Sequence, residues 1–221
     1  MVRIGVIGGT GPAGRAVAVQ FAAIGERVVI GSRERSRAEG TASELAERWS
    51  DRRLDLEAAD NAGAAEADVV VVATPWEAVP GTLAELAGAL EGKLVVSMAN
   101  ALTKWGRYMV PVVPPTGSVA GAVALALPRS RVAAAFHHLP AEPWADLDHP
   151  LEADVLVLAD RRADAREVVG MVDRLPGLRG VDAGNLANAA AVEALTATLV
   201  GINIRYKAHA SIRLTGLERD R

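Results

Sequence analysis

The stretch that most restricts the fold lies at the start of the chain, where a short apolar run over residues 4–7 leads into Gly8-Gly9-Thr10-Gly11-Pro12-Ala13-Gly14. The run is rich in β-branched residues and too short for a helix, which is typical of a strand. After the glycines, Val17, Phe21 and Ile24 recur at helical spacing. This change of period across a glycine turn predicts a strand, a tight turn and a helix in immediate succession.

The spacing from Gly9 to Gly14, G-x-G-x-x-G, is that of a dinucleotide-binding turn. Gly9 can form the tight turn, Gly11 lets the backbone approach a pyrophosphate, and Gly14 lets the helix pack close to the strand. Free N–H groups at the start of the helix would face the anion. The motif alone is weak evidence, with a merely flexible turn as the alternative, but its place between a strand and a helix favours a dinucleotide site.

The end of the next predicted strand, over residues 27–30, indicates which dinucleotide binds. An NAD site usually carries a carboxylate there, yet no Asp or Glu lies between Val28 and Arg33, and Ser32 and Arg33 occupy the place of the acid. Arg37 follows within one helical turn. A guanidinium group matches a phosphate in geometry, so the cluster favours the 2′-phosphate of NADP over a solvated helix start.

The remaining pattern alternates strands with helices, which predicts an α/β protein with a Rossmann-type, doubly wound and mostly parallel sheet. Continuous apolar runs predict buried parallel strands, and apolar stripes predict the helices between them. The expected strands cover residues 67–73, 94–98, 132–136, 154–159 and 180–182, and the expected helices cover residues 37–49, 78–90 and 163–175. Ligand loops should gather at the carboxyl ends of the strands.

Two segments differ from this alternation. Residues 101–121 are rich in proline and glycine, which predicts a loop that reaches over the cofactor cleft. Residues 185–205 form one long apolar pattern, which predicts a helix buried against the sheet domain or a second subunit. We therefore expect a dinucleotide-binding domain over residues 1–183 and a small helical domain over residues 184–221, with a homodimer held by the long helix.

Composition argues against several classes of protein. The net charge of −3 and the scattered arginines give no basis for binding nucleic acid. Cysteine is absent, which suits a cytoplasmic protein, and the longest apolar pattern is interrupted by Asn and Thr, which disfavours a membrane span. No His, Asp or Glu grouping has the spacing of a zinc site, and no G-x-S-x-G elbow is present, so we expect neither a metal nor a hydrolase.

Two adjacent histidines, His137 and His138, follow the strand predicted over residues 132–136. A histidine at this edge of the sheet could hydrogen-bond a carbonyl or donate a proton near neutral pH. The alternative is that one of the pair only packs at the end of the strand. Trp76, Trp105 and Trp144 lie in or beside predicted loops, where they could stack on a flat ring or belong to the core.

Taken together, these residues resemble the NADPH:coenzyme F420 oxidoreductases, which exchange hydride between NADPH and an 8-hydroxy-5-deazaflavin. The resemblance covers most of the chain and is weakest over residues 104–121 and after Arg205. It rests on the glycine motif, Ile30-Gly31-Ser32-Arg33, Thr74-Pro75-Trp76-Glu77, Phe136-His137-His138-Leu139-Pro140-Ala141, and Asp182-Ala183-Gly184-Asn185 through Val192-Glu193.

The resemblance implies a set of cofactor-binding residues. NADP would be held by Thr10, Gly11, Pro12 and Ala13 together with Ser32, Arg33 and Arg37. The nicotinamide half of the site and the deazaflavin cleft would be lined by Pro75, Trp76, Asn100, Leu102 and Ala141. The expected activity is direct hydride transfer between NADPH and coenzyme F420, in which catalysis is mostly positioning. The alternatives are an NADP-dependent reductase of a small carbonyl or imine, which needs a proton donor, and an NADP-sensing protein without a second substrate.

Overall fold

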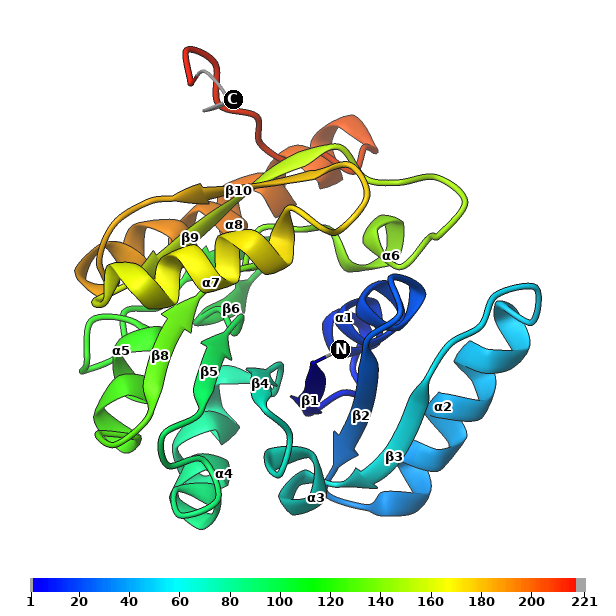
Figure 1. Cartoon of the computed structure of the whole chain (residues 1–221). Helices are drawn as coiled ribbons and strands as arrows, with labels where there is room; N and C mark the ends of the chain where they lie inside the picture. The colour runs from blue at the N-terminus through cyan, green and yellow to red at the C-terminus, as the bar shows by residue number, and fades with distance from the viewer. Residues whose placement is uncertain (1, 218–221) are drawn as a thin grey trace.

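The computed structural model describes residues 2–217, and its centre is one twisted sheet of eight strands within that range (Figure 1). The strand order is β10-β9-β8-β5-β4-β1-β2-β3. The bounds are β1 Arg3–Ile7, β2 Arg27–Ser32, β3 Leu56–Asp60, β4 Val69–Val72, β5 Leu94–Ser97, β8 Arg131–Ala134, β9 Ala153–Ala159 and β10 Leu178–Asp182. Neighbouring strands are parallel except for β8 and β9, which pair antiparallel. The Rossmann-type, mostly parallel sheet predicted from the sequence is confirmed.

Helices cover both faces of the sheet, so the central strands are apolar on both sides. The helices are α1 Pro12–Ala23, α2 Arg35–Arg48, α3 Asn61–Ala65, α4 Val79–Leu86, α5 Val119–Ala126, α6 Ala141–Trp144, α7 Arg162–Val172 and α8 Ala189–Tyr206. In β4, Val69 and Val71 join the core under α1 and α7, whereas Val70 and Val72 join the core under α4 and α5. A strand buried in this way reads as a continuous apolar run, which explains why it is visible in the sequence.

The segment expected to be a loop over the cleft contains a β-hairpin, so that prediction is wrong. Strand β6, Leu102–Trp105, pairs antiparallel with β7, Tyr108–Pro111. The connection is the two-residue turn Gly106-Arg107, in which Gly106 has a φ of 60°. A glycine at the first central position is what a tight hairpin turn of this kind requires. The strand β3 was also missed by the sequence analysis.

The long apolar pattern forms a short 3₁₀ turn, Leu186–Asn188, followed by α8. By length and composition alone, Leu186–Tyr206 could cross a membrane, and 28% of that stretch is buried within the protein. The helix nevertheless carries Glu193, whose carboxylate is buried and accepts hydrogen bonds from the Val119 and Ala120 amides at the start of α5 (2.9 and 3.0 Å). This contact packs α8 against the sheet domain of the same chain. The expected division of the chain after residue 183 stays a prediction.

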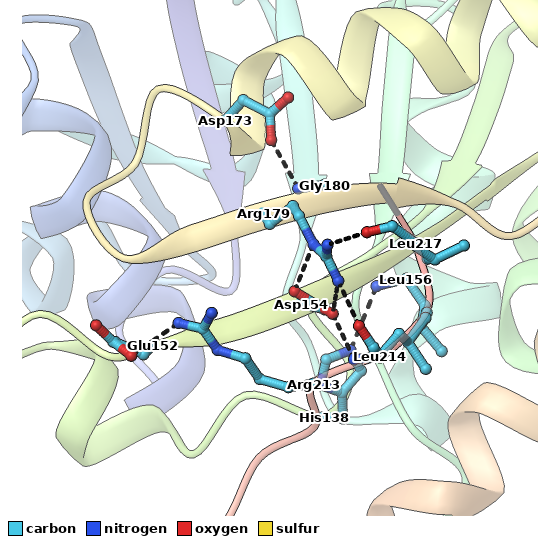
Figure 2. A network of polar contacts seen from close by, with 10 residues as sticks. All are labelled: His138, Glu152, Asp154, Leu156, Asp173, Arg179, Gly180, Arg213, Leu214 and Leu217. Atoms are coloured by element: carbon cyan, nitrogen blue, oxygen red, sulfur yellow. Dashed lines mark hydrogen bonds and ion pairs between the residues drawn. The ribbon is translucent and has the colours of Figure 1, made fainter. Parts of the chain in front are cut away.

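The segment over residues 208–217 returns from α8 to the sheet and is held there by a buried ion pair (Figure 2). Asp154 is fully buried, and its Oδ1 accepts from Arg179 Nε at 2.8 Å. The Leu214 amide donates to Asp154 Oδ2 (2.6 Å), and Arg179 donates to the carbonyls of Leu214 and Leu217. Burial alone would raise the pKa of Asp154, but these hydrogen bonds and the guanidinium charge lower it.

Candidate cofactor and substrate cleft

The glycine turn between β1 and α1 has the shape that the sequence predicts. Gly8 has a φ of 74°, and the Gly9 amide donates to the carbonyls of Val6 (3.1 Å) and Gly31 (2.8 Å), which ties the turn to the end of β2. A Cβ at Gly14 would lie 2.6 Å from the Gly9 Cα, so only glycine lets the helix pack this close to the turn.

The start of α1 is open toward the cleft. No side chain caps its N-terminus, and no acidic residue lies in its first turn. A Cβ at Gly11 would meet no atom nearer than 3.7 Å, so space is left for a ligand to approach the backbone. The unpaired N–H groups of a helix start, in the field of the helix dipole, suit the pyrophosphate of a dinucleotide.

The three residues predicted to read the 2′-phosphate lie between the end of β2 and the first turn of α2. Ser32 is buried at the end of the strand, and its Oγ accepts from the Glu34 amide at 3.4 Å. Arg33 and Arg37 are both exposed, and within residues 2–217 neither forms an ion pair with a carboxylate. Arg35, between them, is paired with Glu39 at 3.0 Å. The two arginines without such a partner are therefore the ones positioned to bind an added phosphate.

A cleft of about 430 Å³ opens at the carboxyl ends of β1, β4 and β5. Seven of the predicted cofactor residues line it, namely Gly11, Pro12, Ala13, Pro75, Trp76, Asn100 and Leu102. Trp76 donates from Nε1 to the carbonyl of Leu102 at 3.3 Å, which joins the two walls. The sequence analysis did not assign Thr74, Met98 or Ala99, which also line the cleft. A cavity of about 690 Å³ is larger but lies elsewhere, between β7 and α8.

Asn100 is held in place from two sides. Its Nδ2 donates to the carbonyl of His137 at 2.9 Å, and Thr196 Oγ1 contacts the same carbonyl (3.0 Å) and Asn100 Oδ1 (3.3 Å). Thr196 belongs to α8, so the C-terminal helix reaches the rim of the cleft. The amide of Asn100 thereby has a fixed orientation toward any ligand in the cleft.

The two histidines are buried and do not line this cleft, nor does Ala141, which begins α6. Burial, together with the neighbouring His138, lowers the pKa of His137 to about 3. Burial lowers the pKa of His138 to about 4, against the opposing effect of Asp154. His138 Nε2 accepts from the Leu156 amide at 3.4 Å, which requires that nitrogen to be unprotonated. Both rings are therefore neutral near pH 7, and a catalytic role for either stays a prediction.

Phe136, just before the histidines, adopts a φ of 66°, which is a strained conformation for a bulky side chain. Its buried ring stacks on Trp144 at 5.3 Å and contacts Phe21 edge to face at 6.2 Å. This packing holds the bend that turns the His137 carbonyl toward Asn100. Of the three loop tryptophans, Trp144 thus belongs to the core, while Trp76 lines the cleft and Trp105 is exposed. Within the described range no three His, Asp or Glu side chains gather as metal ligands.

A glycine turn, an open helix start and a cleft at the carboxyl ends of parallel strands define a dinucleotide-binding protein of the Rossmann class. The family model for the coenzyme F420-dependent NADP oxidoreductases matches residues 3–101. The chain is also 35% identical to the F420-dependent NADP reductase of Methanocaldococcus jannaschii, over 98% of this chain and all of that one. The same enzyme of Methanothermobacter thermautotrophicus is 35% identical, over 98% of this chain and 96% of that one. The chain therefore belongs to the F420-dependent NADP reductase family.

Solved structures agree with this fold. A protein from Arthrobacter sp. FB24 superposes with a TM-score of 0.81 at 23% identity, over 97% of this chain and 100% of that chain. The pyrroline-5-carboxylate reductase of Coxiella burnetii superposes with a TM-score of 0.61 at 18% identity, over 93% and 67% of the two chains. At these identities the likeness concerns the fold alone.

Proposed function

We propose that the protein transfers hydride between NADPH and the deazaflavin coenzyme F420. The observation that carries this proposal is the cleft in which the open start of α1 faces a wall formed by Trp76 and Asn100. The relatives support it, since they are F420-dependent NADP reductases matched along nearly their full length. The two bound ring systems supply the redox chemistry, and the protein supplies proximity, orientation and exclusion of water.

The roles we assign follow from position. The backbone from Gly9 to Gly14 would hold the pyrophosphate. The 2′-phosphate would be bound by Ser32, Arg33 and Arg37. The nicotinamide and deazaflavin rings would lie against Pro75, Trp76, Asn100 and Leu102, which line the cleft. Ala141, at the start of α6, lies outside the cleft and is assigned no contact with either ring. Asn100, oriented by its two hydrogen bonds, can present an amide N–H to a ring carbonyl on which charge develops.

We propose that His137 and His138 act by holding this wall rather than by donating a proton. Both rings are neutral near pH 7, and the His137 carbonyl orients Asn100. Replacing either ring should slow turnover without abolishing it. The carbonyl or imine reductase is disfavoured by the same observation, because it needs an acid beside the nicotinamide. An NADP sensor without a second substrate would show no turnover.

The test is the transfer of deuterium from NADPH labelled at the nicotinamide C4. If the proposal holds, the label appears in the reduced deazaflavin, because the hydride passes directly from ring to ring. Label recovered in water would contradict direct transfer. A deazaflavin that stays oxidised while a small carbonyl or imine is reduced would instead favour the alternative reductase.

We also propose that the protein is a cytoplasmic homodimer in which the first half of α8 packs against its counterpart. Ala191 is exposed there, and Ala194 and Leu195 are only partly covered. The spacing of these residues puts them on one face of the helix, which a dimer contact would cover. Light scattering of the wild type and of Leu195→Glu tests this, since the added charge should shift the protein toward the monomer. A wild type that is monomeric at every accessible concentration would refute the dimer. No nucleic acid or membrane partner is proposed.

A further inference from the structure

Helix α1 forms a second set of contacts besides the open start that faces the cleft. About two turns beyond that start, Gln20 is buried, and its Nε2 donates to the carbonyl of Trp144 in α6 at 2.5 Å. The next residue, Phe21, contacts the ring of Phe136 edge to face. Helix α1 therefore supports both α6 and the segment that follows β8.

That segment begins with a bend at Phe136, whose backbone lies in the left-handed region. Within residues 2–217, the only other non-glycine residue with a positive φ is Lys207, which is exposed at the end of α8. Phe136, by contrast, is buried, and its carbonyl accepts from the Leu139 amide at 3.3 Å, which closes the turn. A bulky residue keeps this conformation only where the surrounding packing imposes it, and such strain is concentrated at functional sites.

The bend determines where the next carbonyl, that of His137, points. This carbonyl accepts from Asn100 Nδ2 at 2.9 Å and from Thr196 Oγ1 at 3.0 Å. The ring of His137 makes no comparable contact, since neither of its nitrogens has a hydrogen-bond partner in the part of the chain that the structure describes. The orientation of Asn100 in the cleft wall therefore depends on the backbone conformation that the bend imposes.

We infer that Phe136 is a positioning residue for the second substrate: its bend fixes the His137 carbonyl, and that carbonyl fixes Asn100. This inference rests on the proposed function. Phe136 does not line the cleft, so it acts through Asn100 and not by touching a ligand. Because Phe21 and Gln20 belong to the helix whose start would hold the pyrophosphate, the NADP site and the Asn100 wall are built on one helix.

Two substitutions separate the backbone of Phe136 from its ring. Phe136→Gly and Phe136→Ala both remove the ring, but only glycine accepts a φ of 66° without strain. We expect kcat/KM for the deazaflavin at saturating NADPH to fall about tenfold in Phe136→Ala, as for the loss of one hydrogen bond to the ring. In Phe136→Gly it should fall less than threefold, because the bend is kept. KM for NADPH should stay within threefold in both variants.

Asn100→Ala shows whether Phe136 acts through Asn100. In a double-mutant cycle, Phe136→Ala should lower kcat/KM for the deazaflavin by less than a further twofold once Asn100 is replaced, because the contact that it positions is already lost. Leu45→Ala is the matched control. It removes a buried side chain from α2, which packs on β2 and β3 toward the opposite edge of the sheet, and should lower stability without changing kcat/KM.

The side-chain amide of Asn100 gives a measurement that needs neither cofactor. The chain has five asparagines, so a sample labelled with ¹⁵N-asparagine contains only five side-chain amide groups, and Asn100→Ala identifies the one in the cleft. Its hydrogen-bonded proton should exchange with water more slowly in the wild type and in Phe136→Gly than in Phe136→Ala. If neither small-residue variant folds, Phe136→Leu, which keeps most of the apolar volume, takes the place of Phe136→Ala and is compared with the wild type.

Equal losses of kcat/KM in Phe136→Gly and Phe136→Ala would overturn the inference and leave the proposed function intact. An undiminished loss in the Asn100→Ala background, or an Asn100 amide that exchanges at one rate in every variant, would overturn it in the same way. A wild type that does not reduce a deazaflavin would refute the proposed function, while the Asn100 amide would still decide whether Phe136 positions that side chain.

Discussion

Acidification from pH 7 to pH 5 should destabilise the folded protein through its two adjacent buried histidines. The pKa of His137 is lowered to about 3 and that of His138 to about 4, both mainly by burial. In the unfolded chain the rings titrate near pH 6.5, so the unfolded state binds protons that the folded state does not. The stability that the neutral rings contribute is therefore present above pH 6.5 and is lost as the pH falls toward 4.

The size of the effect follows from the same shifts. At about 1.4 kcal/mol per pH unit, each histidine should remove about 2 kcal/mol from the free energy of unfolding between pH 7 and pH 5, and the pair about 4 kcal/mol. Glu193 acts in the opposite direction. Burial raises its pKa despite the two amide hydrogen bonds, so its contribution is present at low pH and is lost as the pH rises. The measured loss should be somewhat below the sum for the pair.

Urea unfolding at fixed protein concentration, repeated at pH 7, 6, 5.5 and 5, measures this loss. His138→Gln keeps an acceptor for the Leu156 amide but does not titrate, so it should lose only about half as much stability as the wild type over this range. His209→Gln changes an exposed histidine in the segment after α8 and should behave as the wild type does. An identical pH dependence in His138→Gln and the wild type would refute the assignment of the slope to the buried pair.

Three further predictions follow from other contacts. Arg33→Ala should raise KM for NADPH at least tenfold and leave KM for NADH within twofold. Arg35→Ala should change neither, because Arg35 is paired with Glu39. Equal losses for both cofactors would show that Arg33 does not read the 2′-phosphate. Glu193→Ala should lower the free energy of unfolding by about 3 kcal/mol, because it leaves two buried amides without an acceptor. A loss below about 1 kcal/mol in urea unfolding would contradict this role of the carboxylate. Arg179→Met should accelerate hydrogen exchange in residues 208–217 more than Arg213→Met does, since Arg179 hydrogen-bonds the buried Asp154 and the segment itself, whereas Arg213 is ion-paired with Glu152. Equal exchange in the two variants would count against this.

The parts of the fold that could be predicted are those whose signal is local. Strand β4 is buried on both faces and is therefore an unbroken apolar run. The G-x-G-x-x-G turn is recognisable because each of its glycines meets a different steric requirement of the backbone. Strand β3 was missed because it lies at the edge of the sheet, where Leu56-Glu57-Ala58-Ala59-Asp60 is only partly buried and carries little apolar pattern. The hairpin was missed because the nearby prolines indicate a loop, and Gly106 alone is a weak signal for a hairpin turn.

In the candidate site, too, the residues that could be predicted are those whose signal is local. Residues that act through their own chemistry at a strand end, such as Ser32 and Arg33, were assigned from type and position. Residues that contact partners far away in the sequence could not be assigned in this way. Asn61, for example, accepts from the Gly8 amide (3.2 Å) across 53 positions of sequence. His138 likewise contacts β9, 18 positions further along the chain, so neighbouring residues alone could not decide between a proton donor and a neutral, packed ring.

Helix α8 shows why the second half of such a chain is hard to interpret from sequence and yet decisive for function. Its pattern is simply apolar, but three of its polar residues contact three different structures. Glu193 caps α5, Thr196 contacts Asn100 at the cleft, and Arg205 lines the cavity between β7 and α8. Because the three residues belong to one helix, we expect a shift of α8 that loosens one of these contacts to disturb the other two. A variant at Glu193, which does not line the cleft, should therefore alter KM for the deazaflavin as well as stability, while a helix that merely fills space would change stability alone.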